Sequence, residues 1–378
     1  MADYDFSRAV DYHYGRFPPT NIDFQRVLNP VSRAATALAR YDTMLQTLHN
    51  SDLLLAPLRR REAVISSRIE GTVATLDEVL ELEAEEENDD PNAGPDRHRS
   101  EALEVLAYTR ALHHAQREMA EGLPISGRLI RSAHKRLLMA GRGADKQPGE
   151  FKTEQNYIVD QGRKAVLFVP AAPQKFLDLF SSFEKYVNDE RQNPLLQVAI
   201  SHVEFEALHP FKDGNGRVGR MLVTLMLWSR GVISSPHFYI SGQFENMKDE
   251  YIDRMRHVSE RDAWTEWCVF FLEAMRAQAE ENIDTARNIV ELYNEMKTRF
   301  LEVTHSRWAI VALDYTFSKA VFRNSAFVRD AGIPPQTAHR ITNALTDQGI
   351  LTMLRPPAGR RSALYAFEPL MKLVRPHA

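Results

Sequence analysis

The residues with the clearest chemical potential run from His209 to Arg220 and read His-Pro-Phe-Lys-Asp-Gly-Asn-Gly-Arg-Val-Gly-Arg. An apolar segment, residues 221–228, follows directly. A Gly-Asn-Gly turn that leads into a helix forms an anion site, because glycines let a phosphate approach and the first helical turn offers free N–H groups. Arg217 and Arg220, three residues apart on one helical face, suit the binding of further phosphates. The pattern predicts a phosphate-binding loop with His209 beside it.

Phosphate transfer is the chemistry that these residue types suit. An imidazole with an unperturbed pKa of ~6.5 is a sensible general base near neutral pH. Asp213 supplies one carboxylate, and a single carboxylate with phosphate oxygens is a usual arrangement around Mg²⁺. Phosphate transfer otherwise asks mainly for positioning and charge neutralisation.

The stretch is similar to the signature of the Fic family, His-x-Phe-x-(Asp/Glu)-Gly-Asn-Gly-Arg-x-x-Arg, at all eight specified positions. A structural loop that caps a helix would explain any one of these residues, but it explains eight at fixed spacing poorly. The resemblance implies an all-helical core and the transfer of a nucleotide phosphate, usually AMP from ATP, onto a protein hydroxyl.

The resemblance also implies a role for each residue of the signature. His209 would take the proton from the target hydroxyl, Asp213 would bind Mg²⁺, and Phe211 would anchor the loop in the core. The residues expected to bind ATP here are Gly214, Asn215, Gly216, Arg217, Val218, Gly219 and Arg220. The first three would form the α-phosphate cradle, and the two arginines would hold the β- and γ-phosphates.

Two further features concern the nucleotide. A variant of the family that phosphorylates its target has lysine where this chain has Gly216, so the glycine favours AMP transfer. By resemblance, Asn246 and Tyr251 are candidates for the adenine pocket, although a solvated asparagine and a half-buried tyrosine explain them equally well. The family frequently has two adjacent tyrosines where this chain has Tyr251-Ile252. Because no signature residue touches the base, base specificity stays open.

Upstream, residues 66–71 (Ser-Ser-Arg-Ile-Glu-Gly) resemble the inhibitory motif of Fic proteins, (Ser/Thr)-x-x-x-Glu-(Gly/Asn). Ser66, Glu70 and Gly71 occupy its specified positions. The resemblance implies that Glu70 pairs with Arg220, so that this arginine cannot take the γ-phosphate and ATP binds unproductively. A helix end capped by Gly71 would explain the motif alone, but the downstream signature favours the inhibitory interpretation.

Residues 149–170 resemble the family's flap, a hairpin that docks the target's backbone by strand addition. An ordinary surface hairpin fits the same pattern, and Lys152 stands where the family often has arginine. We interpret His202, Glu204 and Glu206 as structural, because no second histidine completes a catalytic metal-ligand set before the signature.

The overall composition is that of an ordinary globular protein. Of its residues, 44% are hydrophobic and 26% are charged. The length of 378 residues is enough for two or three domains. The net charge of −4 is too mild for a general nucleic-acid binder. Cys268, in an aromatic run, is expected to be a buried thiol. With no signal pattern and no apolar run near ~18 residues, we expect a cytoplasmic protein without a membrane partner.

Helical periodicity dominates, with helices expected at 194–208, 246–259 and 263–296 among others, so the expected fold class is mainly α. We divide the chain into an N-terminal helical region (1–120), a Fic-type helical core (121–297) and a winged-helix domain (298–378). An acidic segment with prolines and a glycine, residues 83–96, is expected to be a solvated loop. A strand-like run at 165–169 predicts a small β-hairpin flap.

The C-terminal segment differs from the rest in charge. Residues 305–378 carry ten Lys/Arg and four Asp/Glu, a net of +6, whereas the remainder is −10. Two helices joined by a turn, the second at 335–347, precede two strands, which resembles a winged-helix domain. Because the second helix carries only one arginine, we expect this segment to dock a target or partner protein. The close alternative is DNA binding, in which the wing arginines Arg355, Arg360 and Arg361 would contact phosphates.

Our leading hypothesis is a self-inhibited, homo-oligomeric protein adenylyltransferase. It would move AMP from ATP, with Mg²⁺, to a Tyr, Ser or Thr hydroxyl of target proteins, including itself. The rival is a DNA-binding transcriptional regulator whose Fic core senses nucleotide, with DNA bound through residues 298–378. A protein that only senses nucleotide would not need His209, which argues against the DNA-binding regulator. A third option is an enzyme of the same fold that uses another phosphate donor.

Overall fold

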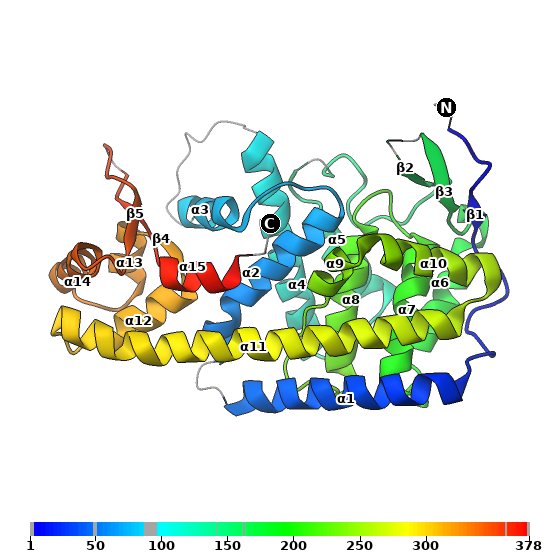
Figure 1. Cartoon of the computed structure of the whole chain (residues 1–378). Coiled ribbons are helices and arrows are strands. Elements are labelled where there is room, and N and C mark those ends of the chain that lie inside the picture. The colour runs from blue at the N-terminus through cyan, green and yellow to red at the C-terminus, as the bar shows by residue number, and fades with distance from the viewer. Residues whose placement is uncertain are drawn as a thin grey trace. The chain divides into compact units, whose positions relative to one another are not determined.

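The computed structural model confirms the mainly α fold class (Figure 1). The residues that it describes are 4–47, 51–86, 97–141, 143–160, 162, 164–359 and 361–375. Over these residues the β-structure consists of two three-stranded sheets and two isolated bridges. No helix among them combines the length and apolarity needed to cross a bilayer.

The chain forms two compact units, each assembled from separate segments. Unit 1 contains Met1–Met44, Ile69–Gly71 and Ala107–Glu280. Unit 2 contains Leu45–Arg68, Thr72–Leu106 and Glu281–Ala378. The chain passes from one unit to the other within the helices α1 (Phe24–Thr47), α2 (Ser51–Ile69), α4 (Arg97–Ala120) and α11 (Trp264–Thr304). The domain limits at residues 120 and 297 stay predictions.

Unit 1 is organised around the helix pair α7 (Pro194–Leu208) and α8 (Asn215–Ser229), which pack against each other. Every residue from Leu195 to Leu208 is buried, as expected for a helix with no polar face. Asn193 caps the start of α7, because its Oδ1 accepts from the amides of Leu195 and Leu196 (3.1 and 3.2 Å). Pro194 then takes the first helical position. Asn193 and Pro194 thus define where α7 begins.

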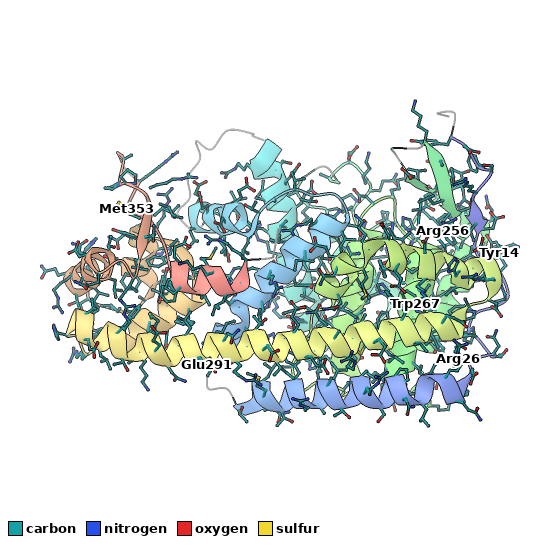
Figure 2. All side chains as sticks on the ribbon, in the orientation of Figure 1. Tyr14, Arg26, Arg256, Trp267, Glu291 and Met353 are labelled. Carbon is teal, nitrogen blue, oxygen red and sulfur yellow. The ribbon has the colours of Figure 1, made fainter. Side chains whose placement is uncertain are left out.

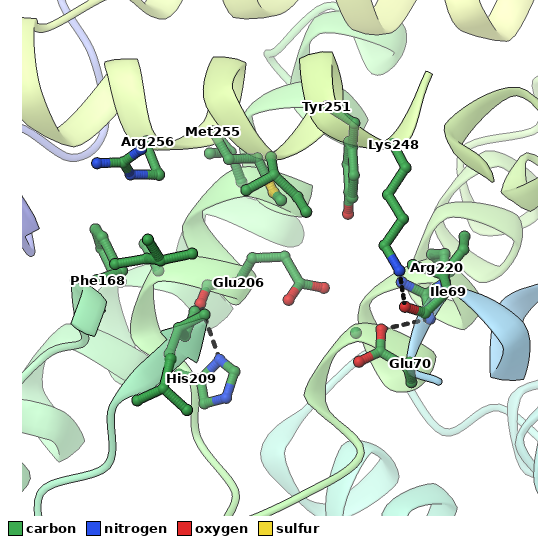
Figure 3. Close-up of a pocket in the computed structure, with 17 residues that line it drawn as sticks. Ile69, Glu70, Phe168, Glu206, His209, Arg220, Lys248, Tyr251, Met255 and Arg256 are labelled. Carbon is green, nitrogen blue, oxygen red and sulfur yellow. Dashed lines mark hydrogen bonds and ion pairs between the residues drawn. The ribbon is translucent and has the colours of Figure 1, made fainter. Parts of the chain in front are cut away.

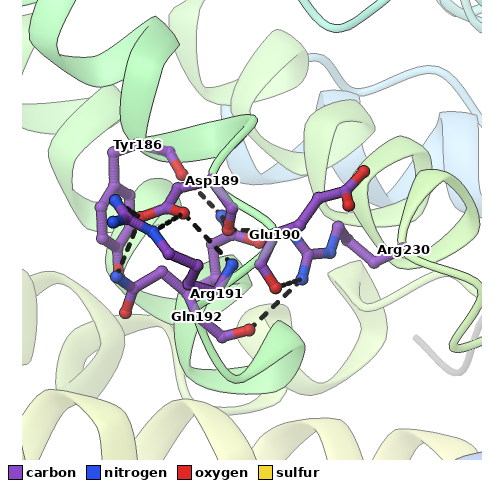
Figure 4. Close-up of polar contacts among 7 residues, drawn as sticks. Tyr186, Asp189, Glu190, Arg191, Gln192 and Arg230 are labelled. Atoms are coloured by element: carbon purple, nitrogen blue, oxygen red, sulfur yellow. Dashed lines mark hydrogen bonds and ion pairs between the residues drawn. The ribbon is translucent and has the colours of Figure 1, made fainter.

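Arg230, directly after α8, ties that helix to the loop in front of α7 (Figure 4). Its guanidinium donates to the carbonyls of Asp189 (2.9 Å) and Glu190 (3.0 Å). Gln197, inside α7, donates to the carbonyls of Tyr186 (2.6 Å) and Asp189 (3.0 Å). These bonds satisfy carbonyl groups of the segment before α7 and link both α7 and α8 to it.

Longer helices pack against this pair. The first part of α11 contributes Trp267, which is fully buried and donates from its indole N–H to the Ala199 carbonyl of α7 (2.7 Å; Figure 2). Cys268 beside it is buried, as predicted. Helix α1 lies along the first part of α11 (Figure 1). Arg26 of α1 pairs with Glu266 of α11 (2.7 Å).

The predicted hairpin is present as β2 (Ile158–Asp160) and β3 (Ala165–Val169), which pair antiparallel. A further strand, β1 (Val10–Asp11), pairs parallel to β3, so the order is β1-β3-β2. We did not predict β1, because two residues leave no alternating pattern to recognise. Among the described residues, β3 is therefore the central strand, and β2, the first strand of the hairpin, is one of the two edge strands with β1.

Other boundaries in unit 1 differ modestly from expectation. Its remaining helices are α5 (Gly127–Leu137), α6 (Pro173–Val187), α9 (Ser241–Asn246) and α10 (Lys248–Arg261). We predicted one helix over 246–259, but the chain breaks at Met247, whose ψ is 34°. The helix predicted to end at residue 296 continues to Thr304, because the helical pattern persists there.

Unit 2 contains a second small sheet and several short helices. Its elements after α2 are α3 (Leu76–Glu86), α12 (Ala309–Ser318), β4 (Val321–Arg323), α13 (Asn324–Asp330), α14 (Pro335–Asp347), β5 (Thr352–Arg355), β6 (Leu364–Ala366) and α15 (Glu368–Val374). The second predicted helix, 335–347, matches α14, whereas β4 and α15 were not predicted. The sheet is antiparallel with the order β4-β6-β5. Its identification as a winged-helix domain stays a prediction.

Helix α3 corrects the prediction of a solvated loop over 83–96, because it continues to Glu86; residues 87–96 lie outside the described residues. Its carboxylates are ion-pair partners of the C-terminal segment. Arg355 pairs with Glu85 (2.8 Å) and with Glu81, and Arg375 pairs with Asp77 (2.8 Å). The basic charge of the C-terminal segment is thus partly neutralised inside unit 2.

Candidate active site

The signature loop is bounded by two residues with positive φ. His209 caps the end of α7 with φ 47°, and its amide donates to the Phe205 carbonyl (3.0 Å). Gly214 has φ 78° and precedes α8, a conformation that glycine adopts without strain. Between them, Phe211 is fully buried, as the anchor role requires. These two turns fix where α7 stops and where α8 begins.

Asn215 shapes this loop with its side chain. Its Oδ1 accepts from the Phe211 amide and its Nδ2 donates to the Phe211 carbonyl, both at 2.8 Å. Asn215 is therefore occupied within the loop, and its backbone N–H at the start of α8 is the group left for an anion.

His134, on α5, packs against the signature loop. We did not predict this residue. Its ring stacks on Phe211 with centroids 3.6 Å apart and an interplanar angle of 6°. The Gly149 amide donates to Nδ1 (2.8 Å), so Nε2 carries the proton and donates to the Asp213 carbonyl (2.9 Å). Burial lowers the pKa of His134 to about 4, so it stays neutral in this structural role.

Lys152 and Asn156 also hold the signature loop, through hydrogen bonds to backbone carbonyls. The Lys152 ammonium donates to the Leu208 carbonyl (2.8 Å) and to Asn156 Oδ1 (3.0 Å). Asn156 Nδ2 in turn donates to the carbonyls of His209 (2.9 Å) and Phe211 (3.0 Å). Burial lowers the pKa of Lys152 to about 7. The residue at the predicted flap's start thus acts as a support of the loop.

His209 has the tautomer that a base needs. Its Nδ1 lies 3.3 Å from the Glu206 carbonyl, and since a carbonyl only accepts, Nδ1 carries the proton and Nε2 keeps its lone pair. Burial lowers the pKa of His209 to about 4, and the nearby Lys152 charge acts in the same direction. The imidazole is therefore neutral at neutral pH.

A pocket opens beside His209 and has two chemically distinct ends (Figure 3). One end is apolar and is lined by the hairpin residues Ile158, Val159, Leu167 and Phe168 with Ile252 and Met255 of α10. The other end carries charge and hydrogen-bonding groups and is lined by Glu70, Gly216, Arg220 and Lys248. Tyr251 and Glu206 line the pocket as well. A long ligand with one flat apolar end and one anionic end fits this division.

Both arginines of the signature are buried and ion-paired. Arg217 is 1% exposed and approaches Asp213 Oδ1 at 3.3 Å. Arg220 is 2% exposed, and its Nη2 donates to Glu70 Oε1 at 2.8 Å. The Glu70 carboxylate also covers Gly216, because a Cβ added to that glycine would lie 2.2 Å from Glu70 Oε1. One carboxylate therefore both neutralises Arg220 and covers the start of α8.

Glu70 is held at the end of α2 by two features. Gly71 has φ 87° and ends the helix. Lys248, a residue we did not predict, donates to the Ile69 carbonyl at 2.7 Å. Burial alone would raise the pKa of Glu70, but the Arg220 guanidinium outweighs it and keeps this pKa below its ordinary value. Glu70 is therefore ionised at neutral pH. Ser66, one turn earlier in the helix, is fully buried.

The structure separates the two candidates for the adenine pocket. Tyr251 is 3% exposed, lines the pocket and donates to Nε2 of His202 (2.8 Å). Asn246, the last residue of α9, is exposed and is not among the described residues that line the pocket. Of the other predicted positions, Val218 is buried and Gly219 faces Glu206. The functional roles of these residues stay predictions.

Asp213 fits a divalent cation bound mainly by phosphate. Its Oδ1 accepts from the Gly214 amide (2.6 Å), and its side chain is 32% exposed. Groups of three or more His, Cys, Asp or Glu side chains that would form a metal cage do not occur within the described ranges. A single carboxylate next to the start of α8 suits Mg²⁺, which usually keeps several waters and takes phosphate oxygens.

Comparison with known proteins agrees with this arrangement. The model of the Fic/DOC family N-terminal region matches residues 28–117, and that of the Fic/DOC family matches residues 124–227. Protein adenylyltransferase Fic of Drosophila grimshawi is 30% identical over 131 residues, which are 34% of this chain and 25% of that protein. Protein adenylyltransferase fic-1 of Caenorhabditis briggsae is 30% identical over 32% of this chain and 24% of its own length. The matched part thus spans about a quarter of these relatives.

Solved structures share the fold. A Fic family protein from Desulfovibrio desulfuricans superposes with a TM-score of 0.56 at 18% identity, over 90% of this chain and 95% of that one. A signalling protein with a Fic domain from Bacteroides thetaiotaomicron gives 0.55 at 19% identity, over 68% and 97%. The two family models, the complete signature and the shared fold lead to one conclusion: the chain belongs to the Fic/DOC family.

Proposed function

We propose that this chain is a protein adenylyltransferase that transfers AMP from ATP to a hydroxyl group of a protein, with itself among the targets. The pocket supports this, because its apolar end suits a base and its Gly216–Arg220 end suits phosphates. The names of the Drosophila and Caenorhabditis relatives support AMP as the group transferred. The observation that carries the proposal is the neutral His209, whose Nε2 keeps its lone pair, in the same pocket as Gly216 and Arg220.

Each of several residues of the site would have its own part in the proposed AMP transfer. In the proposed step the target oxygen bonds to the α-phosphorus, the bond from that phosphorus to the bridging oxygen of pyrophosphate breaks, and His209 Nε2 takes the hydroxyl proton. The first turn of α8 and Arg217 offset the charge on the phosphates. Mg²⁺ held by Asp213 would add to this charge neutralisation. The hairpin's edge strand β2 offers main-chain groups for docking the target.

Self-inhibition is the second part of the proposal. Arg220 must be free to hold the γ-phosphate, yet it is bonded to Glu70, and Glu70 also covers Gly216. An ATP molecule entering the pocket would meet a carboxylate where its phosphates belong, so it would bind weakly or in an unproductive pose. Removal of the Glu70 carboxyl would relieve both obstacles.

The test uses ATP labelled at either the α- or the γ-phosphate, with the purified chain alone and with added cell extract. The Glu70→Gly variant should transfer α-label to protein faster than the parent chain, and γ-label should stay off protein. In the Glu70→Gly background, His209→Ala should reduce transfer by ~10²–10⁴-fold, the usual effect of losing a general base.

Three results would contradict the proposal in different ways. Transfer of γ-label would mean that the chain phosphorylates its target. Unchanged activity in His209→Ala would remove the assigned base. A Glu70→Gly variant no more active than the parent across a range of ATP and Mg²⁺ would leave the transferase standing but remove self-inhibition.

A further inference from the structure

Glu206 differs from the other acidic side chains in the core of unit 1. It is 9% exposed, and its Oε1 has no hydrogen-bond partner among the residues that the structure describes. By contrast, Glu204 is fully buried but accepts from the Tyr12 hydroxyl (2.6 Å) and pairs with His13 Nε2 (2.7 Å). A buried acceptor without a partner is costly and rare. Glu206 therefore requires an explanation other than the structural one that suits Glu204.

The carboxyl of Glu206 lies at the middle of the pocket. Glu206 is three residues before His209 on α7, and Figure 3 shows its carboxyl between His209 and Tyr251, directed into the pocket. The apolar end near Phe168 and Met255 lies on one side of it, and the charged end is on the other.

Gly219 on α8 provides the room for this position. A Cβ added at residue 219 would lie 2.2 Å from Glu206 Oε1. The carboxyl thus occupies space that exists because residue 219 has no side chain. This explains the glycine without involving it in nucleotide contact.

The charge state of Glu206 suits a site near phosphates. Burial raises the pKa of Glu206 to about 8; the Glu70 carboxylate acts in the same direction, whereas Arg220 opposes it. The group is therefore mostly a neutral carboxylic acid at pH 7, which both donates and accepts a hydrogen bond. A neutral acid does not repel an anionic ligand.

We propose that Glu206 recognises the sugar of the bound nucleotide by hydrogen bonding to a ribose hydroxyl. The sugar is the part of a nucleotide that connects the base to the phosphates, and Glu206 stands between the ends of the pocket that suit those two parts. Carboxyl groups are known partners of ribose hydroxyls in nucleotide sites. This inference rests on the proposed use of a nucleotide.

A polar group built to bind a substrate hydroxyl discriminates strongly against analogues that lack it, because it is then left buried and unpaired. The chain should therefore prefer ATP to 2′-deoxyATP or to 3′-deoxyATP. We expect kcat/KM for at least one of these analogues to be roughly tenfold or more below that for ATP. The measurement uses the Glu70→Gly variant, so that Arg220 is free in every comparison.

The Glu206→Val variant should lose this preference. Its kcat/KM for ATP should fall to about the value for the poorer deoxy analogue, and its kcat/KM for that analogue should change little. Val203→Ala provides the matched control, because Val203 lines the same pocket with an apolar side chain. That change should lower kcat/KM for ATP and for both deoxy analogues by a similar factor, and so preserve the preference.

Binding in an inactive background separates this inference from the proposed function. In Glu70→Gly/His209→Ala, the Kd values of ATP and the two deoxy analogues are measured by calorimetry. If ATP and both analogues bind and react equally well, Glu206 does not recognise the sugar, although the proposed transferase function is unaffected. A preference that survives in a folded Glu206→Val variant would overturn the assignment to this residue. If no nucleotide binds, the proposed function fails and this inference with it.

Discussion

At the scale of single residues, a backbone carbonyl determines which ring nitrogen of His209 carries the proton. The Glu206 carbonyl accepts from Nδ1, so Nε2 is the nitrogen that would accept the proton in the proposed reaction. Burial and Lys152 together keep the imidazole neutral. A neutral imidazole is ready to accept a proton, although a low pKa weakens it as a base. Catalysis then depends on how well the loop positions the imidazole, which is the work of Asn215, Asn156 and Lys152.

The lowered pKa of His209 makes a prediction about pH. Because its pKa is depressed to about 4, the base form persists well below the ordinary value of ~6.5. In the Glu70→Gly variant, kcat/KM should stay nearly constant from pH 7 to about 5 and fall only as the pH approaches 4. We would measure it with α-labelled ATP and follow the fold by circular dichroism at each pH. An acidic limb centred near pH 6.5, with the fold intact, would contradict a buried neutral base.

Only some of the residues that form the site were predictable from the sequence. The signature indicated His209, Asp213 and the two arginines because their spacing is fixed and specific. His134, which packs on the signature loop, and Lys248, which holds the end of α2, lie 75 and 39 residues from His209 in the sequence. No local sequence pattern connects either residue with the signature. Glu206 was interpreted as structural together with Glu204, since two glutamates on one helix look alike until burial and hydrogen bonds distinguish them.

At the scale of elements, the end of α2 decides whether Arg220 is available. The last carbonyls of a helix have no partner within the helix and carry the negative end of its dipole. Lys248, the first residue of α10, donates to one of them, the Ile69 carbonyl, at 2.7 Å. This bond fixes the residue just before Glu70. In the proposed self-inhibition, Lys248 would therefore act as a positioning residue for Glu70.

We predict that Lys248→Met weakens self-inhibition. Methionine keeps much of the side-chain length but cannot donate, and a hydrogen bond of this kind contributes about 0.5–1.5 kcal/mol. Transfer of α-label at saturating ATP should rise by roughly two- to tenfold. Arg254→Ala, on the same helix but paired with Glu250 (3.0 Å), should leave transfer unchanged. The prediction fails if Lys248→Met has parental activity while Glu70→Gly is activated, or if the rise persists in a Glu70→Gly background.

The sequence predicted the larger elements well and the small ones poorly. Helix α7 at 194–208 and helix α14 at 335–347 were predicted with the correct limits, because proline fixes where they begin and a change of pattern shows where they end. The strands β1 and β4 and the helix α15 have only two, three and seven residues. Their existence depends on pairing with distant segments, as β1 with β3, which periodicity does not reveal.

At the scale of the whole molecule, the charge asymmetry along the chain has an internal explanation. The basic C-terminal segment suggested contact with DNA, but several of its cations already have partners in unit 2. Arg355 pairs with α3, Arg375 pairs with Asp77 and Glu368, and Arg323 lies 3.7 Å from Glu85. Of the wing arginines, Arg360 lies outside the described residues, and Arg361 has interactions of its own. The +6 excess therefore overstates the charge available to a nucleic acid.

We predict that the 378-residue chain binds duplex DNA only weakly at physiological salt, and that the C-terminal segment docks a protein instead. Binding is measured by fluorescence anisotropy across a salt titration. A protein that neutralises several phosphates shows a log–log slope of about −0.9 per phosphate. Glu81→Gln/Glu85→Gln, which releases Arg355 from α3, should strengthen DNA binding and steepen this slope by about one phosphate. Sub-micromolar binding by the parent chain with a steep slope, weakened in Arg355→Ala, would instead favour the DNA-binding regulator.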